Sequence, residues 1–383
     1  MKTLKKLLYT IPLAGMMFTS CTDVENMEFE HIGGYNTMEN EQSKAYYAEL
    51  RAYKATANNY GRPVAFGWFS NWAPSGPMRK GYLTSVPDSM DIISMWSGAP
   101  GRYEITEAQK KDKEFVQKVK GIKLLEVSLL SHIGKGRTPN SIYTEIEKQA
   151  EEEHWSDYQL AEAKKRARWK FWGYTSGNPQ GNDLKQAIAN YAKALCDSLV
   201  VNEWDGFDID WEPTGGFNDA DGTLTYYDDA TQSYPNIELL VKEMGKYIGP
   251  NSDPEGKGHK LLCIDGYINH FGADIDKYID YWITQSYGSS RPNYTPKSGN
   301  LRKLIITENF ESFASHGGHI LSQARWMPNE GYKGGVGAYR FDNDYNNTPD
   351  YKWMRQAIQI NQQVFNEWKD AQEGNQNKES KNK

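Results

Sequence analysis

The sequence predicts an α/β protein that folds as a single-domain (β/α)8 TIM barrel, and three observations favour this class. Eight short apolar runs with strand character are separated mostly by helical patterns, and alternating strand and helix units in this number predict a closed parallel barrel. The chain has 383 residues, and an α/β barrel commonly occupies a whole chain of this size. No Gly-x-Gly-x-x-Gly follows the first strand, so nothing supports the alternative, an open doubly wound sheet.

Each predicted strand is a short run rich in aromatic, aliphatic or β-branched residues. The first run has the sequence PVAFGWFSNW, the fourth has GFDIDW and the eighth has GVGAYRF. In chain order the eight runs lie at residues 63–72, 90–96, 122–131, 206–211, 261–267, 281–287, 304–307 and 335–341.

The helices are predicted from stretches in which charged and apolar residues recur near helical spacing. One helix precedes the first strand, a charged helix precedes the third, and a long charge-rich region and a second helix precede the fourth. Another helix precedes the fifth strand, and a last one follows the eighth. These helices cover residues 43–58, 107–120, 141–172, 183–200, 237–248 and 350–368.

Residues 1–20 have the pattern of an export signal. Three lysines precede an apolar run over residues 7–18, and two small residues stand directly before Cys21. The run is too short to span a bilayer, which takes about 20 residues as a helix. The small residues before Cys21 resemble the lipobox of bacterial lipoproteins, in which the cysteine is acylated and becomes the new N-terminus. Ordinary cleavage nearby, with Cys21 as a free thiol, is the alternative.

A polar tether is expected over residues 21–35. It carries four carboxylates, and this acidic stretch resembles the tag of surface-exposed lipoproteins in Bacteroidota. We therefore expect an exported lipoprotein whose lipid anchor lies in the outer membrane, facing the cell exterior. Residues 36–368 are predicted to form the barrel, and residues 369–383, which are polar and lack aromatics, a disordered tail.

Composition excludes several classes of function. The formal net charge is −6, and no run of Lys or Arg after the N-terminus exceeds three residues, so we expect no nucleic acid partner. Cys196 and Cys263 are too few for a disulfide framework, and both are predicted in the core. The seven His form no H-x-x-x-H or H-E-x-x-H pair, so we expect neither a catalytic metal nor a cofactor. Aromatic residues make up 13% of the chain, which indicates a surface that stacks on sugar rings.

The segment Asp205-Gly-Phe-Asp-Ile-Asp-Trp-Glu212 carries the strongest indication of chemistry. Successive side chains of a strand point to opposite faces, so Asp208, Asp210 and Glu212 share one face at steps of ~6.6 Å. The other face is apolar and suits contact with the barrel helices, so the three carboxylates are predicted to point into the barrel. Adjacent buried carboxylates cannot all ionise, and such a cluster indicates a functional site.

A calcium loop is the structural alternative for these acids. Such loops need glycine and turn residues between their ligands, whereas large apolar residues intervene here. The segment resembles instead the D-x-x-D-x-D-x-E signature of glycoside hydrolase family 18, which lies on the fourth barrel strand. The signature is matched at Asp205, Asp208, Asp210 and Glu212.

This resemblance implies a retaining hydrolase in which the 2-acetamido group of the substrate is the nucleophile. Glu212 would protonate the glycosidic oxygen and later deprotonate the incoming water. Asp210 would hold the acetamido N–H and stabilise the oxazolinium charge, while Asp208 would share a proton with Asp210.

Three further features extend the resemblance. Gln285 and Tyr287 share a face of the sixth predicted strand and look like the family's Gln-x-Tyr pair, which contacts the N-acetyl group; ordinary strand packing is the alternative. Ser131-His-Ile-Gly134 is similar to the family's S-x-G-G motif with one glycine absent, and we expect it to shape the end of the third strand. Tyr339 stands where many chitinases place a tryptophan floor.

Other residues are candidates for binding substrate in the cleft. Trp72 and Trp96 end the first two strands and can serve as sugar platforms or as core residues. Asp265 and Tyr267 share a face of the fifth strand and are predicted to line the cleft. The insertion over residues 214–236 is rich in Gly, Asp, Asn, Thr and Tyr, which suits either a loop over the site or a spacer.

The resemblance implies cleavage after an N-acetylglucosamine, either in the core of N-linked glycans, by an endo-β-N-acetylglucosaminidase, or in chitin. Gln285 with Tyr287 resembles the endoglycosidases, whereas Trp211 leans toward chitinases. A tethered barrel without a chitin-binding module favours N-glycans as substrates, with other glycan-uptake proteins as partners. The alternative from another class is a non-catalytic surface glycan-binding protein; such proteins lose the catalytic glutamate, and Glu212 is present.

Overall fold

The computed structural model describes residues 42–96, 104–214 and 221–381. The predicted export signal, acylation site and tether all lie outside these ranges. Among the described residues, no helix combines the length and the apolar composition needed to cross a bilayer.

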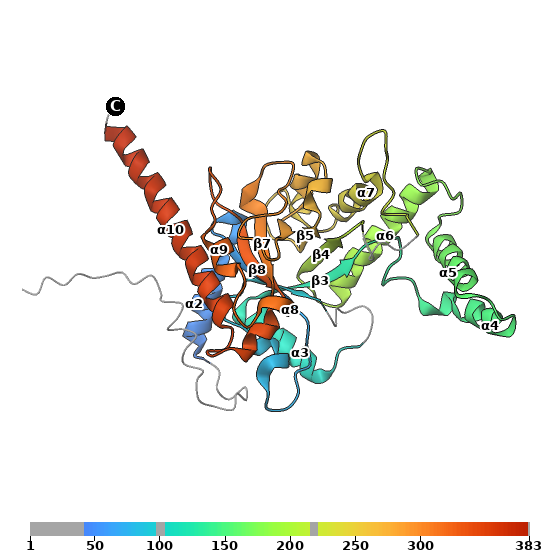
Figure 1. Cartoon of the computed structure of the whole chain (residues 1–383), viewed down its shortest axis with the longest axis horizontal. Helices are drawn as coiled ribbons and strands as arrows, with labels where there is room; N and C mark the ends of the chain where they lie inside the picture. The colour runs from blue at the N-terminus through green and yellow to red at the C-terminus, as the bar shows by residue number, and fades with distance from the viewer. Residues whose placement is uncertain (1–41, 97–103, 215–220, 382–383) are drawn as a thin grey trace, which may run out of the picture.

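Eight parallel strands close into a barrel in chain order, which confirms the predicted fold class (Figure 1). β1 pairs with β8 to complete the ring, with Val64 opposite Gly335. The strands are β1 (Val64–Phe69), β2 (Ile92–Met95), β3 (Lys123–Leu129), β4 (Gly206–Trp211), β5 (Leu261–Gly266), β6 (Tyr281–Gln285), β7 (Leu304–Asn309) and β8 (Gly335–Tyr339).

Helices cover the barrel unevenly. Between β6 and β7 the chain forms only the 3-10 turn Leu301–Lys303, and between β5 and β6 it forms only two short 3-10 segments. In the described ranges the α-helices are α2 (Lys44–Ala55), α3 (Glu107–Glu114), α4 (Thr144–Glu152), α5 (Asp157–Trp172), α6 (Asn182–Val201), α7 (Pro235–Met244), α8 (Phe310–Phe313), α9 (Ile320–Arg325) and α10 (Lys352–Lys381).

The charge-rich region predicted as one helical stretch over 141–172 is two helices. A capping box starts α5: the Ser156 hydroxyl accepts from the backbone N–H of Gln159, and the Gln159 side chain accepts from the backbone N–H of Ser156. Such a box satisfies two N–H groups that a helix start leaves without partners. The chain therefore begins a new helix here instead of continuing α4.

The C-terminal tail is helical where we expected disorder. α10 continues to Lys381 instead of ending near residue 368. The extension contains three Lys, two Gln and two Glu over residues 369–381, and these residue types favour helix. Lys369 also lies 4.0 Å from Glu373, one turn further on, and such pairs support an exposed helix.

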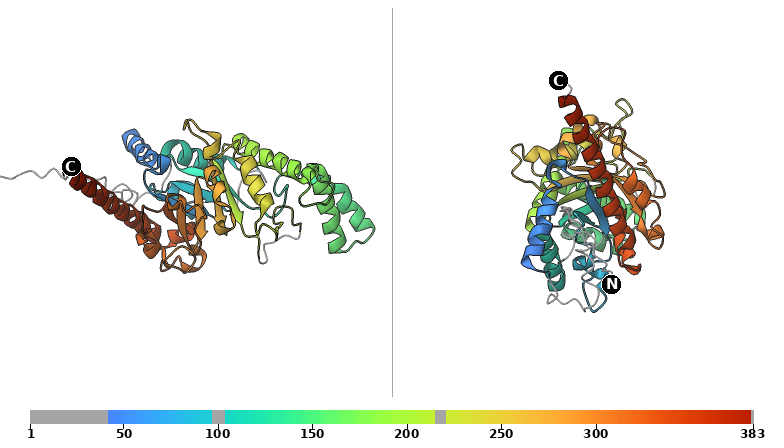
Figure 2. Two further views of the ribbon diagram at one scale, coloured as in Figure 1. Left: turned by 90° about the horizontal axis from the view of Figure 1, so that it is seen from above. Right: turned by 90° about the vertical axis from the view of Figure 1, so that its left-hand side faces the viewer.

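α4 and α5 form a hairpin that projects from the barrel, at the opposite end of the molecule from the free end of α10 (Figures 1 and 2). Only Ala150 of α4 and Trp172 of α5 are buried. Trp172 fixes the base of the hairpin, since its Nε1 donates to Thr138 Oγ1 at 2.9 Å and its ring lies 5.3 Å from that of Tyr191 in α6.

Two apolar cores lie on the two faces of the barrel wall. The outer core packs the strands against the helices and contains the apolar residues of β4. Cys196 of α6 belongs to the outer core and Cys263 of β5 to the inner one, and both are buried as predicted. The inner core consists of Val64, Phe66, Trp68, Ile92, Leu125, Val127, Cys263, Tyr281, Ile283 and Ile305.

Candidate active site

β4 presents its acids to the barrel interior, as its alternation predicts. Its apolar residues lie in the outer core, so Asp208 and Asp210 point the other way and are 0% and 1% exposed. Glu212 comes directly after the strand and is partly exposed. The acids therefore extend from the barrel interior to its carboxyl-terminal mouth, where active sites of this fold are built.

A neighbouring strand adds another buried carboxylate. Asp265 of β5 is the register partner of Asp210 and is 1% exposed. From β6, Gln285 Nε2 donates a hydrogen bond to Asp265 Oδ1 at 2.8 Å. Asp265 thus belongs to the acid cluster, and the side chain of Gln285 contacts this acid.

Two donors from β1 and β2 hold Asp208. Trp68 Nε1 donates to Asp208 Oδ2 at 3.0 Å, and Ser94 Oγ donates to the same oxygen at 2.7 Å. Burial raises the pKa of Asp208 to about 6, although both hydrogen bonds act to lower it. Neither Trp68 nor Ser94 was predicted as a site residue. The alternation of β1 indicates that Trp68 and Phe66 share a face, but only the barrel register brings that face to Asp208.

Asp210 and Asp265 lack donors for two ionised carboxylates. Among the described residues, no N–H group or hydroxyl donates to either oxygen of Asp210 or to Oδ2 of Asp265, although Asp265 lies within hydrogen-bonding reach of Asp210 and Asp208. Burial raises the pKa of Asp210 well above its usual value, and Glu212 and Asp208 raise it further. Burial also raises the pKa of Asp265, with Asp210 and Asp208 as the next causes. The cluster therefore retains a proton under conditions in which isolated carboxylates have lost theirs.

Lys135 is a cation near the acids that the sequence analysis missed. It lies in the turn after β3, and its charge acts to lower the pKa of Asp210 against the larger effect of burial. Gly134 precedes it with a φ of 80°, and a Cβ there would lie 2.2 Å from Trp172 Nε1. This agrees with the interpretation that Ser131–Gly134 shapes the strand end. No sequence pattern marks Lys135 itself.

Aromatic residues from three strand ends gather near the acids. The Tyr339 ring lies 5.3 Å from that of Trp96 and 6.1 Å from that of Tyr287, and Trp96 is 37% exposed. Burial raises the pKa of Tyr287 well above its usual value, and Asp265 and Asp210 raise it further. Tyr287 therefore keeps its hydroxyl proton and can donate it in a hydrogen bond.

Trp72 is not part of this site. It is 6% exposed within the outer core, its Nε1 donates to Asp112 Oδ2 of α3 at 2.9 Å, and its ring lies 6.2 Å from that of Trp204. The sugar-platform interpretation of Trp72 is therefore wrong, because this side chain packs β1 against the surrounding helices.

Tyr267 does not continue the face of Asp265, contrary to the prediction. Gly266 has a φ of 90°, so the alternation of β5 ends there. The Tyr267 ring stacks on that of His270 at 5.1 Å. A Cβ at Gly266 would lie 2.5 Å from the backbone carbonyl oxygen of Trp211, so the glycine permits the close approach of the ends of β4 and β5.

The insertion after β4 is anchored in its described part, residues 221–236. Arg168 of α5 forms an ion pair with Asp221, whose side chain is 0% exposed. Thr223 Oγ1 accepts a hydrogen bond at 3.0 Å from the backbone N–H of Ile133, in the turn after β3. The insertion thereby connects the α4–α5 hairpin to the end of β3.

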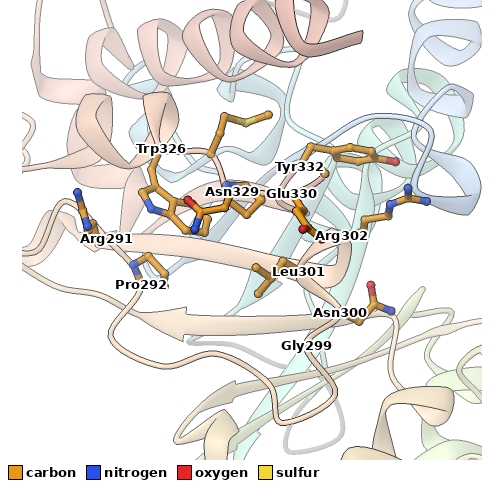
Figure 3. Close-up of a pocket in the computed structure, with 13 residues that line it drawn as sticks. Arg291, Pro292, Gly299, Asn300, Leu301, Arg302, Trp326, Asn329, Glu330 and Tyr332 are labelled. Carbon is orange, nitrogen blue, oxygen red and sulfur yellow. The ribbon is translucent and has the colours of Figure 1, made fainter. Parts of the chain in front are cut away.

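A cavity of about 940 Å³ lies apart from the acids, on the flank of the barrel (Figure 3). The segments that precede β7 and β8 line it, with Arg291, Arg302, Trp326 and Tyr332 among their side chains. None of the predicted site residues lines this cavity. It occupies the flank on which no α-helix separates β6 from β7.

The family described as glycoside hydrolase family 18, BT1044-like, matches residues 22–159 and 153–360. The chain is similar to endo-beta-N-acetylglucosaminidase F2 from Elizabethkingia meningoseptica, with 29% identity over 192 residues. That match covers 44% of this chain and 52% of the relative, so it spans about half the length of the curated relative.

Solved structures share the barrel. A Glu-to-Gln variant of BT1044, in selenomethionine form, is 28% identical with a TM-score of 0.64, over 86% of this chain and 96% of that one. The apo endo-beta-N-acetylglucosaminidase from Cordyceps militaris is 18% identical with a TM-score of 0.53, over 84% of this chain and 97% of that one. At this identity the second likeness concerns the fold alone.

Proposed function

Because this chain belongs to glycoside hydrolase family 18, BT1044-like, we propose that it is a retaining endo-β-N-acetylglucosaminidase acting on the GlcNAc-β-1,4-GlcNAc core of N-linked glycans. Family membership and the similarity to an endo-β-N-acetylglucosaminidase support glycoside hydrolase activity. The observation that carries the finer proposal is the position of Glu212, partly exposed at the mouth of the barrel and beside the buried Asp210.

In the first step, Glu212 protonates the glycosidic oxygen while the bond from this oxygen to C1 breaks. The carbonyl oxygen of the substrate's 2-acetamido group forms a bond to C1, which gives an oxazolinium ion. Water then attacks C1 from the opposite face, the bond from C1 to the acetamido oxygen breaks, and Glu212 accepts the proton of the water. Two inversions at C1 retain its configuration.

Asp210 stabilises the oxazolinium ion in this scheme. No N–H group or hydroxyl of the described residues donates to its oxygens, so an oxygen of Asp210 is free to accept the acetamido N–H. A negative charge in a water-excluded site interacts strongly with a developing positive charge. Tyr287, which keeps its proton, donates to the acetamido group and fixes its direction of attack.

N-glycans are favoured as substrates over chitin by two observations. The curated relative is an endo-β-N-acetylglucosaminidase, in line with the Gln285 and Tyr287 pair. The presence of Trp211 favoured chitinases in the sequence, but its side chain is 0% exposed in the outer core and does not contact a substrate. The rings of Trp96 and Tyr339 offer faces on which sugars stack.

Mass spectrometry of a glycoprotein tests this function. We expect the wild type, but not Glu212→Gln, to leave a single N-acetylglucosamine on the protein, with high-mannose and complex-type glycoproteins tried in parallel. Cleavage of chitin oligosaccharides alone would make the protein a chitinase. Equal binding of glycans by both proteins, with no cleavage of any substrate, would make it a glycan-binding protein.

We also propose that the protein is an exported lipoprotein, acylated at Cys21 and exposed at the cell surface. The apolar run, the small residues before Cys21 and the acidic tether support this location. An anchor of this kind would hold the barrel near its glycan substrates and near other glycan-uptake proteins.

A further inference from the structure

We propose that Asp265 is a positioning residue for Asp210: a proton on Asp265 Oδ2 is donated in a hydrogen bond to Asp210, and Gln285 holds Asp265 in the orientation that allows it. The inference rests on the proposed function of the same site. It gives Asp265 and Gln285 roles toward Asp210 instead of toward the sugar.

The contacts of Asp265 leave one oxygen for this role. Its Oδ1 accepts from Gln285 Nε2 at 2.8 Å, and no N–H group or hydroxyl of the described residues donates to its Oδ2. Asp210 lies opposite in the β4–β5 register, and no such group donates to either of its oxygens. Each side chain is 1% exposed, so bulk water does not serve these oxygens. A hydrogen bond between one carboxylic acid and one carboxylate satisfies both groups.

Asp208 is the member of the cluster best suited to stay ionised. Its Oδ2 accepts from Trp68 Nε1 and Ser94 Oγ, and two donors on one oxygen favour a carboxylate. Burial is the only cause that raises its pKa, to about 6, whereas neighbouring acids also raise the pKa values of Asp210 and Asp265. The proton therefore resides on the Asp210 and Asp265 pair.

The charges around the pair favour a neutral Asp265. Burial is the largest cause of its raised pKa, followed by Asp210 and Asp208. Lys135 opposes these effects at Asp210 from the turn after β3. The ionisable groups that face Asp265 from β4, from its own strand and from the end of β6 are all acidic: Asp208, Asp210, Glu212, Cys263 and Tyr287.

This arrangement has a consequence for catalysis. A neutral Asp265 adds no charge to the site and holds one Asp210 oxygen, which leaves the other to accept the acetamido N–H. When Asp265 loses its proton at alkaline pH, the hydrogen bond is lost and a second negative charge stands beside Asp210. Because the pKa of Asp265 is raised, activity is expected to fall as pH increases through that raised value.

Asp265→Asn and Asp265→Ala test the role, because the carboxamide can donate to Asp210 and accept from Gln285 without titrating. We expect Asp265→Asn to keep kcat within about threefold and to move the alkaline fall to higher pH, while Asp265→Ala lowers kcat about tenfold or more. Cys263→Ala, the inward-facing neighbour on β5, is the control that should keep the wild-type profile. An unchanged profile in Asp265→Ala, or an Asp265→Asn variant as impaired as Asp265→Ala, would overturn the proposal.

A double-mutant cycle tests the role of Gln285. If Gln285 acts through Asp265, Gln285→Leu lowers kcat less in the Asp265→Ala background than in the wild type. Additive losses would mean that Gln285 contacts the sugar, and would remove it from the proposal.

A measurement that needs no turnover separates this inference from the proposed function. In 13C NMR of protein labelled at the aspartate carboxyl carbons, we expect a protonated carboxyl signal at neutral pH that disappears in Asp265→Asn and persists in Cys263→Ala. If the signal is lost only in Asp265→Asn and the protein cleaves no glycan, the proton on Asp265 is supported and the proposed endoglycosidase function is wrong. If the protein cleaves glycan but Asp265→Asn loses no such signal, Asp265 is not the protonated acid, and the proposed function is unaffected.

Discussion

Individual carboxylates at the centre of the barrel differ in the partners that the strands provide. From donors that are not acids, Asp208 receives two hydrogen bonds and Asp265 receives one, whereas the hydrogen-bond partner of Asp210 is the acid Asp265. Because their hydrogen-bond partners differ, neighbouring aspartates can carry different charges at the same pH. This difference also means that stability and activity depend on pH through the same residues.

Asp208→Asn is expected to raise the melting temperature at about pH 8 and to change it little at about pH 4. The folded pKa of Asp208, about 6, lies above its ordinary value of 3.8. The folded state therefore binds more protons than the unfolded state between these values, so stability is fully present below the lower value and is lost as pH rises through the upper one. The amide cannot ionise and avoids this loss. Differential scanning calorimetry at both pH values measures the effect.

The control for this prediction is Asp197→Asn. Asp197 pairs with Lys193 on the surface, where both side chains are more than half exposed, and such pairs contribute little. A gain in melting temperature that is the same at acid and alkaline pH would contradict the account of Asp208.

At the scale of residues, the sequence predicted what depends on one strand. Alternation along β4 placed Asp208 and Asp210 correctly because it is a local property of the backbone. Trp68 and Lys135 were missed, since their proximity to the acids depends on which strands and turns close the barrel. The error at Trp72 has a similar origin, because residues beyond a strand end can turn to either face of the wall.

At the scale of elements, the α4–α5 hairpin and the insertion after β4 are coupled. Arg168 on α5 pairs with Asp221 at the start of the described insertion, and Asn236 Nδ2 near its end donates to the carbonyl of Thr223 at 2.8 Å. A helix outside the barrel thereby orders a segment that follows the strand of the catalytic acids.

Arg168→Ala is expected to destabilise the protein by about 3 kcal/mol, because it leaves the buried Asp221 carboxylate without its cation. Hydrogen exchange over residues 221–236 should accelerate more than exchange in β4. Lys164→Ala is the matched control on the same helix: its partner Glu147 is 52% exposed, so this variant should lose little. Equal effects of the two variants on exchange in the insertion would refute the coupling.

Strands and helices were predicted correctly where their local sequence pattern was distinctive. All eight strands were predicted, because each is an apolar run with flanking helices or turns. The break between α4 and α5 was also encoded, since Ser156 and Gln159 form a capping box, but continuous charge on both sides concealed it. The helical extension of α10 was missed because its polar composition is common to disordered tails and exposed helices.

At the scale of the whole molecule, closure of the barrel brings side chains from several strands together at one site. β1, β2, β5 and β6 contribute Trp68, Ser94, Asp265 and Gln285 to acids that stand on β4. The number of strand and helix units was sufficient to predict a barrel, because few other folds use eight of them. No α-helix was predicted between the fifth and eighth strands, which agrees with the structure before β6 and β7, whereas the short helices α8 and α9 before β8 were missed.

Cys21→Ala is expected to release the protein from the membrane fraction. Acylation at Cys21 would supply the anchor, because acyl chains bind bilayers through their buried CH2 groups. Fractionation of cells fed a fatty-acid analogue measures both lipid incorporation and location. Cys196→Ala should behave as the wild type, and a Cys21→Ala protein that stays in the membrane without lipid would exclude this anchor.

The exposed hairpin has a practical consequence for handling the protein. Its distal turn joins α4 to α5 at residues 153–156, far from the barrel in two views (Figures 1 and 2), and exposed turns tolerate insertions well. A peptide tag or a fluorophore inserted there would sit outside both cores and away from the aromatic residues at the mouth. The turn is therefore a suitable point for coupling the protein to a bead or a sensor surface with the mouth of its barrel still open.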